Sequence, residues 1–136
     1  MVATFCYNIA HDLPIQIDDA PYPLSLVYID DLVTTFAQIM VGKEVCKTYC
    51  EIQPSYTISL GELANQVRAF RASRDTLVSE RVGDGLTRAL YATYISYLSP
   101  KDFAYEVPKY VDPRGVFAEM LKTRDSGQFS FFTAHP

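Results

Sequence analysis

The sequence predicts an α+β fold in which helices come first and short β-strands follow. Segments with apolar residues at helical spacing fill most of residues 1–99, with short extended segments between them. After Pro100 the pattern changes to short strand-like pieces separated by turns. A run of helices followed by a run of strands is typical of α+β proteins or of separate domains. We therefore expect two parts, 1–99 and 100–136, with a boundary near residues 99–103.

The N-terminal elements follow from local patterns. Apolar residues at helical spacing predict a helix over 2–10, and alternation predicts a strand over 13–18. The apolar run at 24–29 predicts a strand that is buried on both faces. An amphipathic segment predicts a helix over about 31–41, which Gly42 ends.

Two further helices are predicted in the middle of the chain, after an extended segment at 47–59 that Pro54 interrupts. Ser59 and Glu62 have the spacing of a capping box, in which each side chain binds the backbone N–H of the other residue. The helix that follows has an apolar face formed by Leu60, Leu63, Ala64, Val67 and Phe70. The next helix, over 83–98, has a core face formed by Leu86, Leu90, Tyr94 and Leu98, and Pro100 ends it.

The C-terminal part is predicted to be rich in hairpins. Strand-like segments occupy 103–107, 115–123 and 127–136, and the turn sequences "DPRG" and "RDSG" separate them.

Composition excludes several classes of protein. With 136 residues, 49% of them hydrophobic and 21% charged, the chain has the length and composition of a folded domain or of pieces of two. A net charge of −4 argues against sequence-independent binding of nucleic acid, which needs a clustered basic surface. No apolar run approaches the ~20 residues that span a bilayer, and no signal peptide is recognisable.

The three cysteines, Cys6, Cys46 and Cys50, have no disulfide-framework spacing. This pattern favours free thiols in a reducing cytoplasm. The alternative is a zinc site on the CxxxC of Cys46 and Cys50, but zinc needs four converging ligands, and His11 and His135 are distant in sequence.

Asp30 and Asp31 follow the apolar run directly and leave two interpretations open. Adjacent helical positions point about 100° apart, so the two carboxylates do not share one substrate proton. An aspartate at a helix start accepts backbone N–H bonds and interacts favourably with the helix dipole. The other interpretation places the pair in a cleft, where it orients a neighbouring loop.

Other candidate motifs carry little chemistry. Tyr105 and Lys109 spell YxxxK, which in a helix stacks the lysine beside the tyrosine, but Pro108 breaks the helix. The glycines have neither GxGxxG nor P-loop spacing, and "VGDGL" predicts a helix-initiating turn rather than a ligand loop. The spacing of Arg68, Arg71 and Arg74 places them near one another on one side of a helix. They form either a solvated face with salt bridges or an edge that binds a diphosphate or a partner.

Several segments together resemble the bifunctional capsular polysaccharide enzymes of the CapF/WbjC type. They are "VATFCYNIAHDLPIQIDD", "LVYIDDLV", "SLGELANQVRAFRASRDTL", "GDGLTRALYATYISYL" and "DPRGVFAEMLKTRDSGQFSFFTAHP". Proteins of this family have an extended short-chain dehydrogenase/reductase (SDR) domain, which is Rossmann-like, followed by a C-terminal cupin. The resemblance implies that residues 1–99 are the substrate-side, C-terminal portion of the reductase domain and that 100–136 are the first strands of the cupin.

The resemblance also implies the function. The family reduces and epimerises a UDP-linked 2-acetamido-2,6-dideoxy-4-keto-hexose on the way to N-acetyl-L-fucosamine, using NADPH and a cupin metal, zinc. The motifs for both lie outside this sequence, so we expect a fragment that binds no cofactor or metal and is inactive alone. By resemblance, Phe5, Asn8, Leu13 and Ile15 line the sugar-nucleotide side of the cleft and Arg74 approaches the diphosphate.

The resemblance implies a UDP-sugar as the substrate of the longer enzyme. From charge and composition we expect no nucleic acid and no membrane span, and from exposed apolar surface and strand edges we expect a homo-oligomer, a dimer. The alternative is a small helical module that binds a partner protein and catalyses nothing.

Overall fold

The computed structural model describes residues 1–43 and 49–134. The chain forms two compact units. The larger unit contains Met1–Gln16 and Ala64–Pro136, and the smaller contains Ile17–Leu63. Within the described part of the chain there are four α-helices and two sheets, which confirms the α+β class. No described helix has the length and apolar character that crossing a membrane requires.

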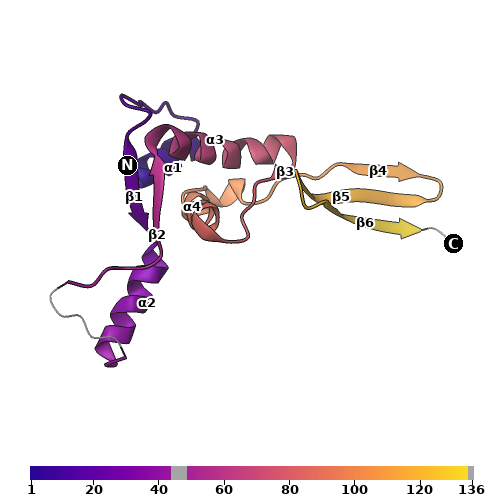
Figure 1. Ribbon diagram of the computed structural model, residues 1–136. Helices are drawn as coiled ribbons and strands as arrows, with labels where there is room; N and C mark the ends of the chain where they lie inside the picture. The colour runs from indigo at the N-terminus through magenta and orange to yellow at the C-terminus, as the bar shows by residue number, and fades with distance from the viewer. Residues whose placement is uncertain (44–48, 135–136) are drawn as a thin grey trace. The chain divides into compact units, whose positions relative to one another are not determined.

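Three helices form the core of the larger unit: α1 (Val2–Ala10), α3 (Leu60–Thr76) and α4 (Gly85–Ile95). α1 packs against α4 (Figure 1). Apolar side chains at helical spacing are buried between the three helices, namely Phe5, Cys6, Ile9, Ala64, Val67, Phe70, Ala89, Leu90, Tyr94 and Leu98. The predicted helix over 2–10 and the predicted apolar face of α3 are therefore confirmed. The predicted face of α4 is confirmed for Leu90, Tyr94 and Leu98, whereas Leu86 is only half-buried.

The larger unit also contains a sheet of four strands: β3 (Val78–Ser79), β4 (Lys109–Asp112), β5 (Gly115–Thr123) and β6 (Gln128–Ala134). β4, β5 and β6 form an antiparallel meander, as the turn sequences predict, and β3 pairs in parallel with the end of β5 (Figure 1).

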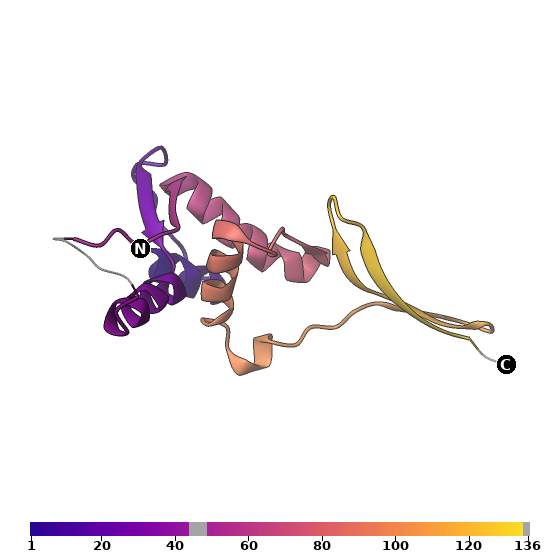
Figure 2. The ribbon, with the colours of Figure 1, turned by 60° about the horizontal axis from the view of Figure 1, so that its bottom comes forward.

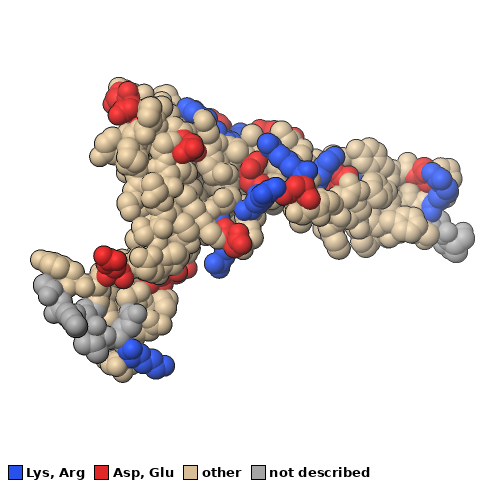
Figure 3. Space-filling view, in the orientation of Figure 1, with Lys and Arg blue, Asp and Glu red and all other residues tan. Residues whose placement is uncertain are grey.

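Two ion pairs fasten β3 to the turn between β5 and β6. Arg81 pairs with Asp125, and Arg124 pairs with Glu80. Figure 3 shows basic and acidic side chains interspersed in this region.

The boundary expected near residue 99 does not coincide with the boundaries of the compact units, which lie at residues 16/17 and 63/64. β3 precedes residue 99 and β5 follows it, and the two strands pair with each other. The assignment of 1–99 and 100–136 to two enzyme domains stays a prediction.

The predicted strand over 103–107 is wrong. Residues 100–102 form a short 3₁₀ turn, and the chain runs without strand pairing until β4 begins at Lys109 (Figure 2). Pro108 has no N–H to donate to a ladder, so the alternating side chains before it do not recruit a partner strand.

The smaller unit contains a β-ribbon and helix α2. β1 (Pro23–Val27) pairs antiparallel with β2 (Ser55–Ser59), with Pro23 opposite Ser59. Side chains of β1 alternate between exposed and half-buried, so the expectation of burial on both faces is wrong. Pairing with β2 occupies one edge of β1 and covers neither face, and the alternation shows that other residues cover only one face.

The predicted strand over 13–18 is also absent, and these residues form no strand pairing. Pro14 lacks a backbone donor, and its carbonyl oxygen instead accepts a hydrogen bond of 2.9 Å from the side-chain amide of Asn8. The segment is therefore held as an extended connection after α1.

Helix α2 (Ile29–Met40) begins two residues earlier than predicted, with Tyr28 at the N-cap. Asp30 and Asp31 lie in its first turn, after the N-cap position that Tyr28 occupies without a side-chain cap hydrogen bond. They are thus placed to interact with the helix dipole rather than to cap it. Phe36 and Met40, which were expected to lie on one apolar side, are 54% and 86% exposed.

The capping box at the start of α3 is confirmed. The backbone N–H of Ser59 donates to Glu62 Oε2 at 3.0 Å, and the N–H of Glu62 donates to Ser59 Oγ at 3.3 Å. Because these hydrogen bonds favour the ionised carboxyl group, the pKa of Glu62 is lowered.

The cysteines differ from expectation in part. Cys6 is a free thiol and fully buried, as predicted. Cys50 is disulfide-bonded, so the prediction of a free thiol is wrong for this residue. Cys46 and His135 lie outside the described residues.

Candidate functional site

A cavity of about 350 Å³ lies within the larger unit, where the helices meet the connection that leads to β4. Four segments form its wall: the turn after α1, one side of α3, the end of α4 and residues 99–105. The lining residues are Ala10, His11, Asp12, Arg71, Arg74, Tyr94, Leu98, Ser99, Lys101, Asp102, Ala104 and Tyr105.

Arg71 closes one side of the cavity and has its charge compensated. Its Nε lies 3.3 Å from Asp12 Oδ1, and its Nη1 lies 3.2 Å from Asp75 Oδ2, one helical turn away. The hydrogen bond to Asp12 raises the pKa of Arg71, so the guanidinium stays charged. Arg71 thus behaves as the salt-bridged interpretation of the arginine face predicts.

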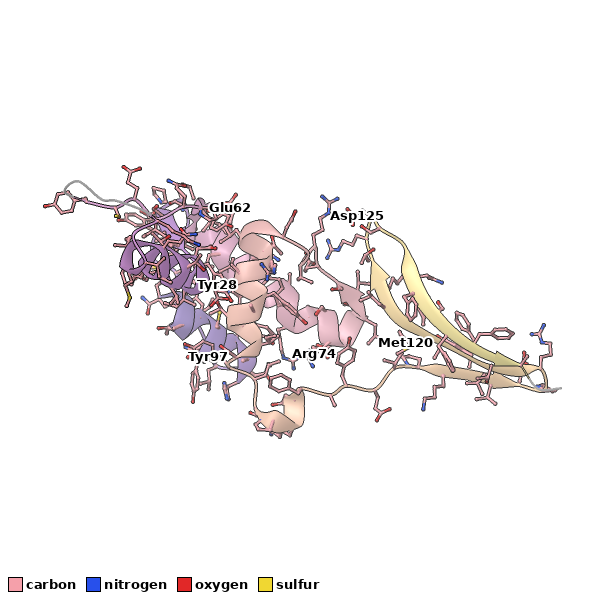
Figure 4. The ribbon with its side chains drawn as sticks, turned by 90° about the horizontal axis from the view of Figure 1, so that it is seen from below. Tyr28, Glu62, Arg74, Tyr97, Met120 and Asp125 are labelled. Carbon is pink, nitrogen blue, oxygen red and sulfur yellow. The ribbon has the colours of Figure 1, made fainter. Side chains whose placement is uncertain are left out.

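Arg74 holds the connection to β4 against α3. Its Nη1 donates to the carbonyl oxygens of Asp102 at 2.7 Å and Phe103 at 3.0 Å. Its Cζ lies 4.9 Å from the centre of the Tyr105 ring, a cation–π distance. Figure 4 shows Arg74 between α3 and this connection. None of the ion pairs found among the described residues involves Arg74.

Tyr94 brings a buried hydroxyl group to the same wall. The residue is 0% exposed, and within the described part of the chain its hydroxyl has no hydrogen-bond partner. Burial raises the pKa of Tyr94, although the positive charges of Arg71 and Arg74 act in the opposite direction. A buried polar atom normally has a partner, so this hydroxyl, like Gln66 Nε2, is an exception among the described residues.

Of the five residues that the family resemblance singled out, Arg74 alone lines this cavity. Phe5 belongs to the helical core at 6% exposure, and Asn8 fastens the segment after α1 through Pro14. Leu13 is 47% exposed and Ile15 is partly buried. The structure does not gather these four around Arg74, and their substrate-binding role stays a prediction.

Sequence reasoning did not assign six polar residues to the cavity, namely His11, Asp12, Tyr94, Ser99, Lys101 and Asp102. Tyr94 could have been recognised from the sequence, because a tyrosine on the predicted core face of a helix places a polar hydroxyl group in the protein interior. The others lie in turns whose placement depends on tertiary packing.

The described residues also locate the remaining candidate motifs. Arg68 donates to Asn65 at 3.3 Å and does not line the cavity. Tyr105 lies in the connection and Lys109 begins β4, so the YxxxK residues do not share a helix. Among the residues that the structure describes, no group of three or more His, Cys, Asp or Glu side chains is placed to hold a metal ion.

Comparisons with known proteins agree with the resemblance seen in the sequence. No family model matches the chain. It is 58% identical over 135 residues to UDP-2-acetamido-2,6-beta-L-arabino-hexul-4-ose reductase of Pseudomonas aeruginosa, a match that covers 99% of this chain and 36% of the relative. The chain is a close homologue of one segment of that protein. It spans about a third of the relative's length.

Solved structures show the same relation. Capsular polysaccharide assembling protein CapF from Staphylococcus aureus matches all of this chain with a TM-score of 0.90 and 34% identity, over 37% of its own length. A complex of CapF with the inhibitor 3-isopropenyl-tropolone matches with a TM-score of 0.88 and 34% identity, over 40% of that chain. The predicted resemblance to proteins of the CapF type is therefore confirmed for the segment that this chain spans.

Proposed function

We propose that this chain supplies part of a UDP-sugar reductase that acts on a UDP-2-acetamido-2,6-dideoxy-4-keto-hexose. The reaction belongs to the synthesis of capsular polysaccharide or O-antigen, on the route to N-acetyl-L-fucosamine. The observation that carries the proposal is the identity of 58% over 135 residues to a reductase of a UDP-linked 4-ketohexose. A structural match over the whole chain to CapF supports it.

The proposal includes a division of labour between two domains. Residues 1–99 contribute to the substrate side of an extended SDR domain, and 100–136 contribute the first strands of a cupin. The order of elements supports this assignment, because the helices precede β4, β5 and β6. The coding sequence on either side of this chain tests it. A Gly-rich βαβ motif upstream and an HxH-type cupin motif downstream are the expected findings, and their joint absence would contradict the assignment.

The proposed role of this chain is to bind and position the substrate. Reduction of a 4-keto group requires a hydride at the carbonyl carbon and a proton at its oxygen. We place the NADPH and the zinc in other parts of the longer protein, and expect the 136-residue chain alone to be inactive. Its glycines lack dinucleotide-binding spacing, and no metal-ligand group occurs among the described residues. Isothermal titration of this chain with NADPH and with zinc tests this point, and stoichiometric micromolar binding of either would contradict it.

Within this role, Phe5, Asn8, Leu13 and Ile15 line the sugar-nucleotide side. A cytoplasmic location and a homodimer belong to the same proposal. Exposed apolar side chains on the sheet, among them Phe131 at 52% and Phe132 at 67%, support association with further protein surface. Light scattering on the longer protein tests the dimer.

A chimera tests the function itself. The matching segment of the Pseudomonas reductase is replaced by this chain, and the conversion of the 4-keto UDP-sugar to the alcohol is followed by mass spectrometry as a gain of two hydrogen atoms. The matched control carries an unrelated α+β segment of the same length. We expect the chimera to form the alcohol and the control to form none.

A further inference from the structure

We propose that the ion pairs of Glu80 with Arg124 and of Arg81 with Asp125 form an ionic clasp, which opens and closes a hinge between the helices and the four-stranded sheet of the larger unit. This inference goes beyond the proposed function, because it concerns how elements of this chain move and does not depend on any activity.

The register of β3 and β5 is the first observation. The two strands pair in parallel over two residues, and the last pair is Ser79 opposite Thr123. Because parallel strands advance together residue by residue, the next positions on the two sides are 80 and 81 and 124 and 125. These are the residues that form the two ion pairs. An acid followed by a base therefore meets a base followed by an acid, and the charges match in this register.

The clasp itself consists of largely solvated charges. Arg124 Nη2 lies 3.4 Å from Glu80 Oε1, and Arg81 Nη2 pairs with Asp125 Oδ2. The side chains of Arg124 and Arg81 are 76% and 80% exposed, whereas that of Glu80 is 20% exposed. An exposed ion pair contributes little on its own, and salt weakens it. The clasp can therefore open without unfolding the chain.

The turn that carries Arg124 and Asp125 moves as part of the sheet. Both the backbone N–H and the Oγ1 hydroxyl of Thr123 donate to the carbonyl oxygen of Gly127 at 2.9 Å. These hydrogen bonds close the turn between β5 and β6. Opening of the clasp therefore separates this turn from β3 and leaves the turn intact.

Apolar packing does not fix the sheet against the helices. Among the described residues of β4, β5 and β6, Ala118 alone belongs to the buried apolar core. Met120 and Leu121 line a cavity of about 230 Å³ together with Leu77 and Tyr91, and yet they are 52% and 47% exposed. Because burial of apolar area is the main term that holds two elements together, the polar clasp has to supply what this packing lacks.

The connection between the helices and β4 is the hinge. Arg74 Nη1 binds the carbonyl oxygens of Asp102 and Phe103, so the start of the connection stays with α3. Residues 104–108 form no strand pairing before β4 begins at Lys109 (Figure 2). When the clasp opens, the sheet can turn about residues 104–108.

Residual dipolar couplings of backbone amides test the hinge on the 136-residue chain, aligned in a stretched neutral gel at about 0.02 M salt, where screening is weak. In the original chain, the couplings of α3, α4, β5 and β6 should fit one alignment tensor. Arg124→Glu replaces the attraction to Glu80 by repulsion, so the sheet should then need a second, smaller tensor. One common tensor in this variant, or two tensors in the original chain, would overturn the proposal.

Arg114→Glu is the matched control. It makes the same charge reversal in the same sheet, but Arg114 pairs with Asp112 in the turn before β5 and not with β3. The control should keep one common tensor. A second tensor in the control as well would show that any charge reversal loosens the sheet, which would reject the clasp.

A charge swap tests whether the two partners act on each other. Glu80→Arg and Arg124→Glu should each accelerate hydrogen exchange about fivefold or more at the most protected amide among residues 78, 79 and 122. The double variant restores an opposite pair and should return the rate to within about twofold of the original. Accelerations that simply multiply in the double variant would contradict the clasp.

The amides of α3 separate hinge opening from unfolding. Their exchange rates should stay within about twofold of the original in all three variants, because the core between the helices is not altered. An equal acceleration in α3 would show that the larger unit unfolds as a whole, and would reject the hinge.

Discussion

Phe70 is expected to carry much of the stability of the larger unit. It is 1% exposed, and its ring lies 5.2 Å from that of Tyr91 and 5.9 Å from that of Tyr94. Phe70→Leu keeps an apolar side chain but removes both ring pairs, each worth about 0.5–1.5 kcal/mol, and leaves a small cavity worth roughly 0.5 kcal/mol. The free energy of unfolding should therefore fall by about 2 kcal/mol.

Urea denaturation followed by circular dichroism measures this loss. With a slope of about 2 kcal/mol per molar urea, the midpoint should fall by about 1 M. The matched control is Phe129→Leu, since Phe129 is 64% exposed on β6 in the same unit and its change should cost less than about 0.5 kcal/mol. Equal shifts in both variants would refute the packing of α3 against α4 described above.

Three further predictions follow from single groups. Burial raises the pKa of Cys6 to about 11, so iodoacetamide should not modify Cys6 in the folded chain at neutral pH but should modify it in urea, as peptide mapping would show. Rapid modification of Cys6 without urea would show that this thiol is accessible. The lowered pKa of Glu62 means that its stabilisation exists above the ordinary glutamate pKa and is lost as the pH falls through the folded value. Glu62→Gln should therefore lower the thermal midpoint at neutral pH, and the difference should disappear once the pH falls below the lowered pKa of Glu62. A difference that does not depend on pH would contradict the role of its charge. Gly115 has φ +151°, and an added Cβ would overlap the Thr133 carbonyl. Gly115→Ala should therefore lower the free energy of unfolding by about 2 kcal/mol or more and weaken the protection of β6 amides from hydrogen exchange. Unchanged hydrogen exchange in β6 would contradict the pairing of β5 with β6.

Local patterns predicted the helices because their signals are contained within one element. The hydrogen bonds between Ser59 and Glu62 join residues three apart, and the face of α3 that includes Leu63 and Val67 repeats at helical spacing. The strand predictions at 13–18 and 103–107 were wrong because an alternating pattern of apolar and polar side chains does not by itself form a strand. A strand also needs a partner, and a proline removes a backbone donor within the first segment (Pro14) and directly after the second (Pro108).

The cavity could be predicted only in part, since its members are far apart in the chain. Arg74 was selected by the family resemblance, whereas spacing alone placed it on one side of a helix together with Arg68 and Arg71. The contact between Asp12 and Arg71 joins positions 59 apart, and the hydrogen bond from Arg74 to Asp102 joins positions 28 apart. No local pattern encodes such distances, because they depend on how α1, α3 and the connection to β4 pack together.

The most direct test of the account is the rate at which the Pseudomonas reductase forms its alcohol product when its matching segment is replaced by this chain. Since the two segments are 58% identical over 135 residues, we expect kcat/KM within about tenfold of the intact reductase. A chimera that is folded and binds its cofactor, yet reduces the UDP-linked ketone no faster than the control with an unrelated segment, would contradict the proposal that this chain supplies part of a UDP-sugar reductase.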